Sequence, residues 1–265
     1  MSSLGRLKKG ACPPSRRRVR FHFSSQNNPS VYFMSASSTP QPAAQSSERR
    51  RYAIVGLGSR HELYQDGIEK THAATAQLVG LCDVNAGRVE LARRRSAKNG
   101  ATVPPGYLAA DFGRMLTETR PDTVIVTTVD ATHHDYLIRA MEAGCDVITE
   151  KPMTTDAETC RRVLATQRRT GRSCRVTFNY RYAPPRSQVK DLLMSGAIGD
   201  VLSVDFHWLL NTHHGADYFR RWHSKKENSG GLFVHKSTHH FDLVNWWLGA
   251  MPVSVMATGK REFYT

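Results

Sequence analysis

The first 47 residues of this 265-residue chain contain no aspartate and no glutamate. They carry seven lysines and arginines, many serines, and a Pro/Gln-rich stretch at residues 39–45. This composition is typical of an organelle transit peptide, and it also fits a disordered basic tail or an extension upstream of initiation at Met34. We expect residues 1–50 to form a disordered basic leader outside the fold. The expected destination is the mitochondrion or plastid if the leader is a transit peptide, and the cytoplasm otherwise.

Long apolar runs and paired cysteines are also missing. No run approaches the roughly 20 apolar residues that a membrane-spanning helix needs. The five cysteines are scattered, with no CxxC pair and no disulfide framework, which fits a reducing compartment. The net charge of +14 divides into +8 for residues 1–50 and +6 for the rest, a mild excess that suits an anionic cofactor. We therefore expect a small-molecule partner, and neither nucleic acid nor a membrane.

Short apolar runs alternate with helical patterns once the leader ends at residue 51. The run TVIVTT is β-branched throughout, as expected of a strand that is buried on both faces. Alternation of this length predicts an α/β fold with a Rossmann-type, doubly wound parallel sheet over residues 51–172. The expected strands are residues 52–55, 78–82, 123–128 and 147–148, and the expected helices are 88–98, 111–119, 134–143 and 156–170.

The pattern changes in the last third of the chain. From Cys174 onward the stretches RVTFNYRY and VLSVDFHWLL alternate as strands do, with one expected helix between them and another after residue 231. We expect an α+β domain over residues 173–265, built on a mixed, largely antiparallel sheet. This second domain is expected to be incomplete at its C-terminus, because the chain stops just after an apparent strand at 253–258.

The glycine turn after the first expected strand lacks the third glycine of a GxGxxG fingerprint, because His61 stands there. Gly56 and Gly58 still permit a tight turn and close approach to a pyrophosphate, and Ser59 and Arg60 continue that turn. Asp83 ends the second expected strand, where a carboxylate can accept hydrogen bonds from ribose hydroxyls. The same carboxylate would repel a 2′-phosphate, so NAD is favoured over NADP. A plain turn without a ligand is the alternative.

Two further expected cofactor contacts follow the strand at 123–128, where a nicotinamide ring would arrive. Thr128 ends this strand, and His133 begins the next helix. His133 could cap that helix or touch the cofactor, or it could be a solvated histidine at a helix N-terminus.

These motifs, together with Glu150-Lys151-Pro152 and Asn-Tyr-Arg-Tyr at residues 179–182, resemble the Gfo/Idh/MocA oxidoreductases from residue 51 to the end of the chain. The resemblance implies an N-terminal Rossmann domain that binds NAD(P), and a second domain that supplies the substrate side and carries a homo-oligomer interface on its sheet. It places Lys151 beside the nicotinamide and the reacting hydroxyl, where an ammonium group stabilises alkoxide character. Glu150 is counted with the cofactor contacts and is expected to be a structural partner.

A second constellation follows two glycines at residues 230–231. On one continuous helix His235, His239 and Asp242 would share a face. The family usually has an aspartate at the position of His235, and its catalytic histidine corresponds to His239. Oxidation of a secondary alcohol needs a base for the hydroxyl proton, so we expect His239 to be the acid/base and His235 to be an altered catalytic partner. A satisfied, half-buried histidine is the alternative.

Three residues are expected to bind substrate. Arg181 matches an arginine that the family keeps at the domain junction, where it could equally form an interdomain salt bridge. Tyr218 and Trp222 could stack on a sugar-like ring, or they could belong to the core.

The sequence therefore predicts an NAD(P)-dependent oxidoreductase that acts on a secondary alcohol or carbonyl of a sugar, polyol or related cyclic compound. One alternative is a catalytically impaired nucleotide-binding sensor or scaffold, suggested by His235 and the short C-terminus. Another is a metal-dependent hydrolase or lyase that uses the histidine face, although no HExxH pattern is present and the favoured interpretation has no metal.

Overall fold

The computed structural model describes residues 48–259. Residues 1–47 of the expected leader lie outside the described residues. Within the described range no helix is long and apolar enough to cross a membrane.

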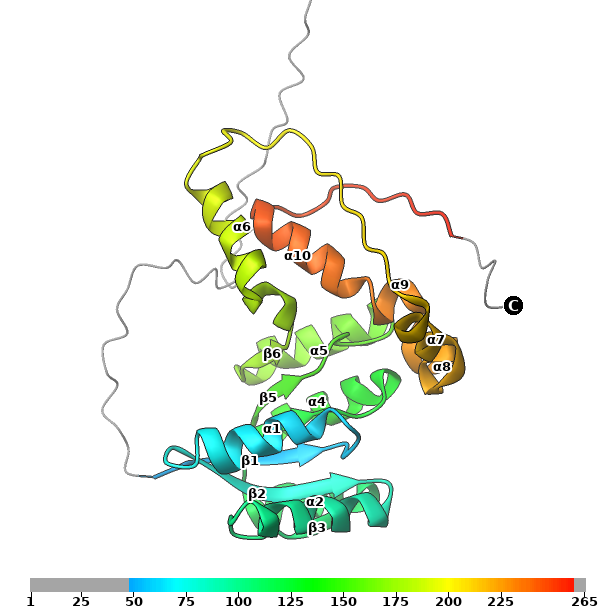
Figure 1. The fold of residues 1–265 in the computed structure, drawn as a ribbon. Coiled ribbons are helices and arrows are strands. Elements are labelled where there is room, and N and C mark those ends of the chain that lie inside the picture. The colour runs from blue at the N-terminus through cyan, green and yellow to red at the C-terminus, as the bar shows by residue number, and fades with distance from the viewer. Residues whose placement is uncertain (1–47, 260–265) are drawn as a thin grey trace, which may run out of the picture. The chain divides into compact units, whose positions relative to one another are not determined.

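A six-stranded parallel sheet forms the body of the described chain (Figure 1), with strand order β3-β2-β1-β4-β5-β6. This is the Rossmann order, in which the direction of winding reverses between β1 and β4 and opens a crevice at the carboxyl ends of these strands. The α/β prediction is confirmed. The strands are β1 Arg50–Val55, β2 Ala76–Asp83, β3 Gly106–Leu108, β4 Thr123–Val126, β5 Asp146–Thr149 and β6 Cys174–Val176.

Helices cover both faces of this sheet. The last of them, α5, begins after the capping side chain of Asp156 and ends at Gly171, which adopts a left-handed conformation, as the sequence predicts. Helix α1, which continues into a π-helical turn over Gly67–Thr71, and the short strand β3 were not predicted from the sequence. The helices are α1 His61–Asp66, α2 Ala86–Lys98, α3 Phe112–Thr119, α4 His133–Glu142 and α5 Ala157–Thr170.

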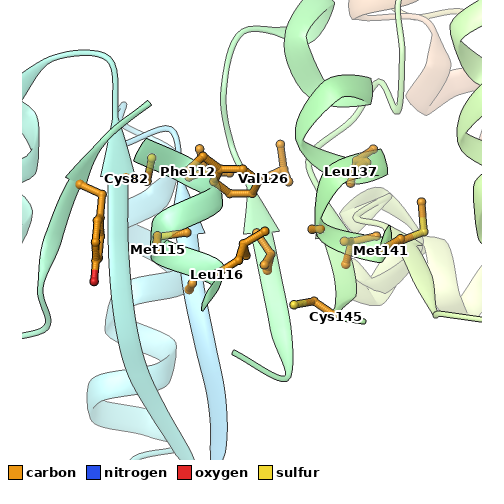
Figure 2. Packing of buried hydrophobic residues seen from close by; sticks show 14 of the residues in the cluster. Cys82, Phe112, Met115, Leu116, Val126, Leu137, Met141 and Cys145 are labelled. Atoms are coloured by element: carbon orange, nitrogen blue, oxygen red, sulfur yellow. The ribbon is translucent and has the colours of Figure 1, made fainter. Parts of the chain in front are cut away.

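Two apolar clusters hold these layers together. Successive residues of β4 face opposite sides, so that Val124 and Val126 join one cluster and Ile125 joins the other. The first cluster, shown in Figure 2, includes Phe112 of α3 and Leu137 of α4. Burial on both faces explains the unbroken β-branched run at 123–128, because each side chain of the strand meets apolar atoms.

The chain after β6 is helical where a second sheet was expected. Of the stretch RVTFNYRY only Cys174–Val176 is a strand, and it extends the parallel sheet by pairing with β5. Residues 201–211 and 251–259 have no strand partner within the described range, so their alternating side chains form no ladder and Leu202 and Leu209 stay exposed. The elements here are α6 Pro184–Met194, α7 Thr212–Arg220, α8 Lys226–Ser229, α9 Leu232–His235 and α10 Thr238–Leu248.

Candidate active site

The glycine turn after β1 is pressed against the loop that follows β4. Gly56 has a φ of +90°, and a Cβ added there would lie 2.5 Å from the backbone nitrogen of Thr128. The hydroxyl of Thr127 donates a hydrogen bond to the carbonyl oxygen of Gly56 at 2.5 Å. Only glycine fits this position, because both the conformation and the space exclude a side chain. The contact fixes Thr128 at the mouth of the crevice.

Gly58 faces open space. A Cβ added there would meet no atom within 4 Å. Among the described residues, the backbone N–H groups of Gly58, Ser59 and Arg60 donate no hydrogen bond. Free N–H groups around an open glycine form a cradle that fits a phosphate anion. These residues therefore fit the pyrophosphate of a dinucleotide.

Asp83 braces this turn from the end of β2. Its carboxylate accepts hydrogen bonds from the N–H of Leu57 at 2.5 Å and from the N–H of Asn85 at 2.8 Å, and the residue is 4% exposed. Each carboxylate oxygen has a second lone pair, so the group still has acceptor capacity for a ribose hydroxyl. Asp83 thus occupies the expected position and also supports the turn.

His133 lies behind the site rather than in it. The residue has no exposed surface, and its ring nitrogens lie 2.8 Å from the carbonyl oxygen of Pro152 and 3.1 Å from that of Thr128. Burial lowers the pKa of its imidazole. The expected cofactor contact is corrected accordingly: His133 connects the loops after β4 and β5. The sequence could not distinguish this arrangement, because the first residue of a helix can point inward or outward.

Glu150 links the end of β5 to α1. Its carboxylate accepts a hydrogen bond from the hydroxyl of Tyr64 at 2.8 Å and lies 3.3 Å from Nε of Arg60. Burial, with a smaller contribution from Glu150, raises the pKa of Tyr64. Glu150 is therefore a structural partner that also positions an arginine of the glycine turn.

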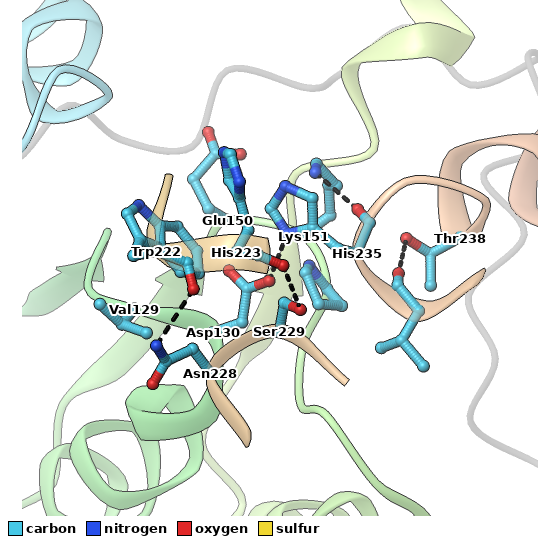
Figure 3. A network of polar contacts seen from close by, with 12 residues as sticks. Val129, Asp130, Glu150, Lys151, Trp222, His223, Asn228, Ser229, His235 and Thr238 are labelled. Carbon is cyan, nitrogen blue, oxygen red and sulfur yellow. Dashed lines mark hydrogen bonds and ion pairs between the residues drawn. The ribbon is translucent and has the colours of Figure 1, made fainter. Parts of the chain in front are cut away.

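Lys151 crosses from the sheet to the helices after β6. Its ammonium group donates a hydrogen bond to the backbone carbonyl oxygen of His235 at 2.8 Å (Figure 3). Burial lowers the pKa of Lys151, while the nearby carboxylates of Asp130 and Glu150 oppose that shift. An ammonium has three donors, so two remain for other acceptors.

His235 does not share a helix face with His239, contrary to the expectation. Helix α9 ends at His235, and α10 begins only at Thr238. Because His235 lies outside that face, its ring forms a hydrogen bond with Asp130 through Nδ1. The sequence does not predict this break between α9 and α10, because Lys236 and Ser237 are compatible with a continuous helix.

Aromatic rings surround the His235 imidazole. The ring centroids of Tyr218, Trp222 and His223 lie 5.5, 5.6 and 5.0 Å from that of His235. Tyr218 and Trp222 are thus brought to the site, where both make edge contacts with the histidine.

His239 is a buried, stacked histidine. It is 4% exposed, and its ring lies 4.0 Å from that of Tyr180 with an interplanar angle of 4°. Its Nδ1 is buried and has no hydrogen-bond partner among the described residues. Burial, together with the nearby ammonium groups of Lys151 and Lys236, lowers the pKa of His239 to about 3. The imidazole is therefore neutral over the physiological range.

Arg181 and Asp242 form a two-pronged ion pair between the turn at Asn179–Tyr182 and α10. Of the two alternatives for Arg181, the structure shows a salt bridge. With Asp242 bound to Arg181 and His235 bound to Asp130, the face proposed for a metal is divided. In residues 48–259 no three histidine, cysteine or acidic side chains gather in a way that could hold a metal ion.

Asp130 and Tyr180 were given no role from the sequence, whereas Lys236 was expected as a possible extra donor beside His235. Asp130 follows β4 and is 3% exposed, and Lys236 donates a hydrogen bond to the hydroxyl of Tyr180 at 2.8 Å. Of Asp130 and Tyr180, only Asp130 could have been predicted as a site residue from the sequence, because a carboxylate just beyond the carboxyl end of a central strand lies at the ligand crevice.

Family models match this architecture in both parts of the chain. Residues 50–178 match the Gfo/Idh/MocA model described as an oxidoreductase family, NAD-binding Rossmann fold, and residues 190–263 match the model for its C-terminal alpha/beta domain. The chain belongs to the Gfo/Idh/MocA oxidoreductase family. NAD, the cofactor favoured from Asp83, is confirmed for its Rossmann domain.

Known Gfo/Idh/MocA proteins resemble most of this chain. The putative oxidoreductase YteT of Bacillus subtilis (strain 168) is 39% identical over 81% of this chain and 50% of its own length. The scyllo-inositol 2-dehydrogenase (NAD(+)) of the same organism is 29% identical over 79% and 57%. The crystal structure of the WlbA dehydrogenase from Bordetella pertussis in complex with NADH and UDP-GlcNAcA has a TM-score of 0.63 and 27% identity over 76% and 60%. The chain thus spans half to three fifths of the length of these relatives.

Proposed function

We propose that this protein transfers hydride between NAD and a secondary alcohol or carbonyl of a sugar, polyol or related cyclic substrate. The observation that carries the proposal is the position of Lys151. Its ammonium follows the carboxyl end of β5, in a sheet whose neighbouring glycine turn fits a dinucleotide, and it reaches the helices that carry the site histidines. A partly buried ammonium with unused donors at such a crevice suits a developing alkoxide.

In this proposal each residue of the site has a distinct role. The Gly56–Gly58 turn and Asp83 bind and orient the cofactor, which supplies the hydride acceptor or donor. Lys151 holds the substrate oxygen and offsets negative charge on it as the C–H bond breaks. A neighbouring imidazole takes the hydroxyl proton, because a neutral alcohol is a poor hydride donor.

The substrate class is supported by the relatives and by the side chains at the site. A scyllo-inositol 2-dehydrogenase and the WlbA dehydrogenase, whose crystal structure is a complex with NADH and UDP-GlcNAcA, are among the relatives. The aromatic rings of Tyr218 and Trp222 lie beside the imidazole of His235, which can form hydrogen bonds. This combination suits a ring bearing several hydroxyls. A homo-oligomer remains part of this proposal, as does a substrate-binding role for Arg181 in a rearranged complex.

The test compares the wild type with Lys151→Met, which keeps the length of the side chain and removes its charge. Activity is followed as NADH formation with NAD⁺ and a panel of myo-inositol, scyllo-inositol, D-glucose and D-glucuronate. We expect kcat/KM to fall about 10²- to 10³-fold, with NADH affinity, from fluorescence titration, within threefold of the wild type.

Lys70→Met is the matched control, because Lys70 forms an exposed ion pair with Asp66 on α1. It should leave both readouts unchanged. Undiminished turnover in Lys151→Met would contradict the assignment of Lys151. NADH binding by a wild type that turns over no member of the panel would favour the nucleotide-binding sensor instead.

A further inference from the structure

Asp130 and His235 meet at the site from positions 105 residues apart in the chain. Asp130 opens the 3₁₀ turn after β4, and His235 is the last residue of α9. Asp130 Oδ2 and His235 Nδ1 form a hydrogen bond, and their side chains are only 5% and 12% exposed (Figure 3). A carboxylate cannot donate a hydrogen bond, so Nδ1 carries the hydrogen in this pair.

When the ring is neutral, that pairing leaves Nε2 of His235 as its acceptor nitrogen. Within residues 48–259 this atom makes no hydrogen bond, and it is not fully buried. A histidine whose Nδ1–H is held by a buried carboxylate, with Nε2 open, has the arrangement of an oriented general base.

His239 is less suited to accept a proton. Its ring stacks on Tyr180, its Nδ1 has no carboxylate partner, and two ammonium groups lie close enough to oppose a positive charge on it. A base works best when its pKa lies near the working pH, and the pKa of His239 lies far below that range.

His235 is also joined to the residue that holds the reacting oxygen. The ammonium group of Lys151 donates its hydrogen bond to the backbone carbonyl of His235. The carboxylate of Asp130 acts electrostatically on the same ammonium. Lys151, Asp130 and His235 therefore form one polar cluster at the carboxyl ends of β4 and β5.

We propose that His235, oriented by Asp130, exchanges the proton of the substrate hydroxyl, and that His239 is a neutral neighbour in the site. This inference rests on the hydride-transfer function proposed above. In oxidation the O–H bond breaks and its proton goes to Nε2 of His235. The electron pair of the C–H bond leaves as hydride to NAD, and the carbonyl forms. Asp130 offsets the imidazolium charge, and Lys151 keeps its protons; reduction reverses each transfer.

The decisive experiment removes the imidazole and supplies it from solution. His235→Ala should lower kcat about 10²- to 10⁴-fold on the panel substrate that the wild type oxidises fastest. Added imidazole should raise the kcat of this variant at least tenfold, and the increase should saturate with imidazole concentration. If the contact between Asp130 and His235 were purely structural, added imidazole would not restore activity. Because the Lys151 contact uses the backbone carbonyl of residue 235, this substitution leaves that contact available.

Two further variants complete the test. Asp130→Asn keeps the shape of the side chain and should lower kcat by tenfold or more with KM within threefold, whereas Asp135→Asn, on the exposed side of α4, should have no effect. His239→Gln should lose less than tenfold in kcat. Urea unfolding and NADH titration confirm that each variant is folded and binds cofactor.

The outcomes separate the two proposals. Full activity in His235→Ala, or no rescue by imidazole, overturns the assignment of His235. The same holds if His239→Gln loses its activity and regains it with imidazole. A wild type that oxidises no member of the panel overturns the hydride-transfer function, and the proton assignment falls with it.

Discussion

At the residue scale, the two glycines of the turn after β1 have opposite surroundings. Gly56 has a positive φ, and the backbone of Thr127 and Thr128 fills the space where its Cβ would start. Gly58 has nothing within 4 Å of that position. Gly56 is therefore required by the fold, whereas Gly58 leaves space for a bound ligand.

Alanine substitutions should separate these roles. Gly56→Ala forces a strained conformation and a clash with backbone, so we expect the free energy of unfolding to fall by about 2 kcal/mol or more. Gly58→Ala should change stability by less than about 0.5 kcal/mol and weaken NADH binding at least tenfold. Urea unfolding and fluorescence titration measure the two effects. Equal destabilisation by both substitutions would refute the distinction.

Among single residues, those with a local cause were predictable from the sequence. Gly56 and Lys151 follow strands and Asp83 ends one, and the carboxyl end of a parallel strand is where a ligand binds. The pairing of Asp130 with His235 was not predictable, because the two residues lie 105 positions apart. Nor was the burial of His133, which depends on loops that arrive from elsewhere in the fold.

At the element scale, an ion pair between side chains joins two of the helical segments after β6. Arg181, in the turn at Asn179–Tyr182, binds Asp242 of α10 with two nitrogens. The Asp242 side chain is 10% exposed and that of Arg181 is 34% exposed. Removing the arginine would leave a largely buried carboxylate without its counter-ion, which is unfavourable.

A double-mutant cycle measures this link. Arg181→Met should destabilise the protein by about 1–3 kcal/mol, which allows for partial solvent screening of the pair. In Arg181→Met/Asp242→Leu the unpaired carboxylate is gone, so the double variant should be less destabilised than the sum of its two single variants. Unfolding in urea supplies all four free energies. Strict additivity would mean that the pair contributes nothing.

Elements were predictable where local pattern and tertiary environment agree. The strand Thr123–Val126 is β-branched throughout and fully buried, and α5 carries its own start and stop signals. The stretch at 201–211 also alternates as a strand does, but alternation states only which side chains share a face. A strand forms when a second strand pairs with it, and the described residues supply none there.

At the scale of the whole molecule, buried neutral histidines couple stability to pH. Burial, with neighbouring cations, lowers the pKa of His239 to about 3 and that of His240 to about 4, from an ordinary value near 6.5. In the window below 6.5 the unfolded chain binds protons that the folded chain does not bind. The free energy of unfolding must therefore fall as the pH falls through this window.

Single substitutions should reduce this dependence. His239→Gln should remove about one proton from the slope of unfolding free energy against pH between about pH 6 and pH 4. His213→Gln, at an exposed position on α7, is the control and should leave the slope unchanged. Urea unfolding across the pH range gives both slopes. An unaltered slope in His239→Gln would contradict the burial of a neutral ring at this position.

The hydrogen bond from Lys151 to the carbonyl oxygen of His235 has a consequence for how such sites diversify. A main-chain acceptor is supplied by any amino acid at residue 235, so the lysine stays anchored whichever side chain that position carries. Selection can then exchange the side chain at 235 in a single step, with no intermediate that loses the lysine's position. The same property makes residue 235 a suitable place to introduce new proton-transfer chemistry by design.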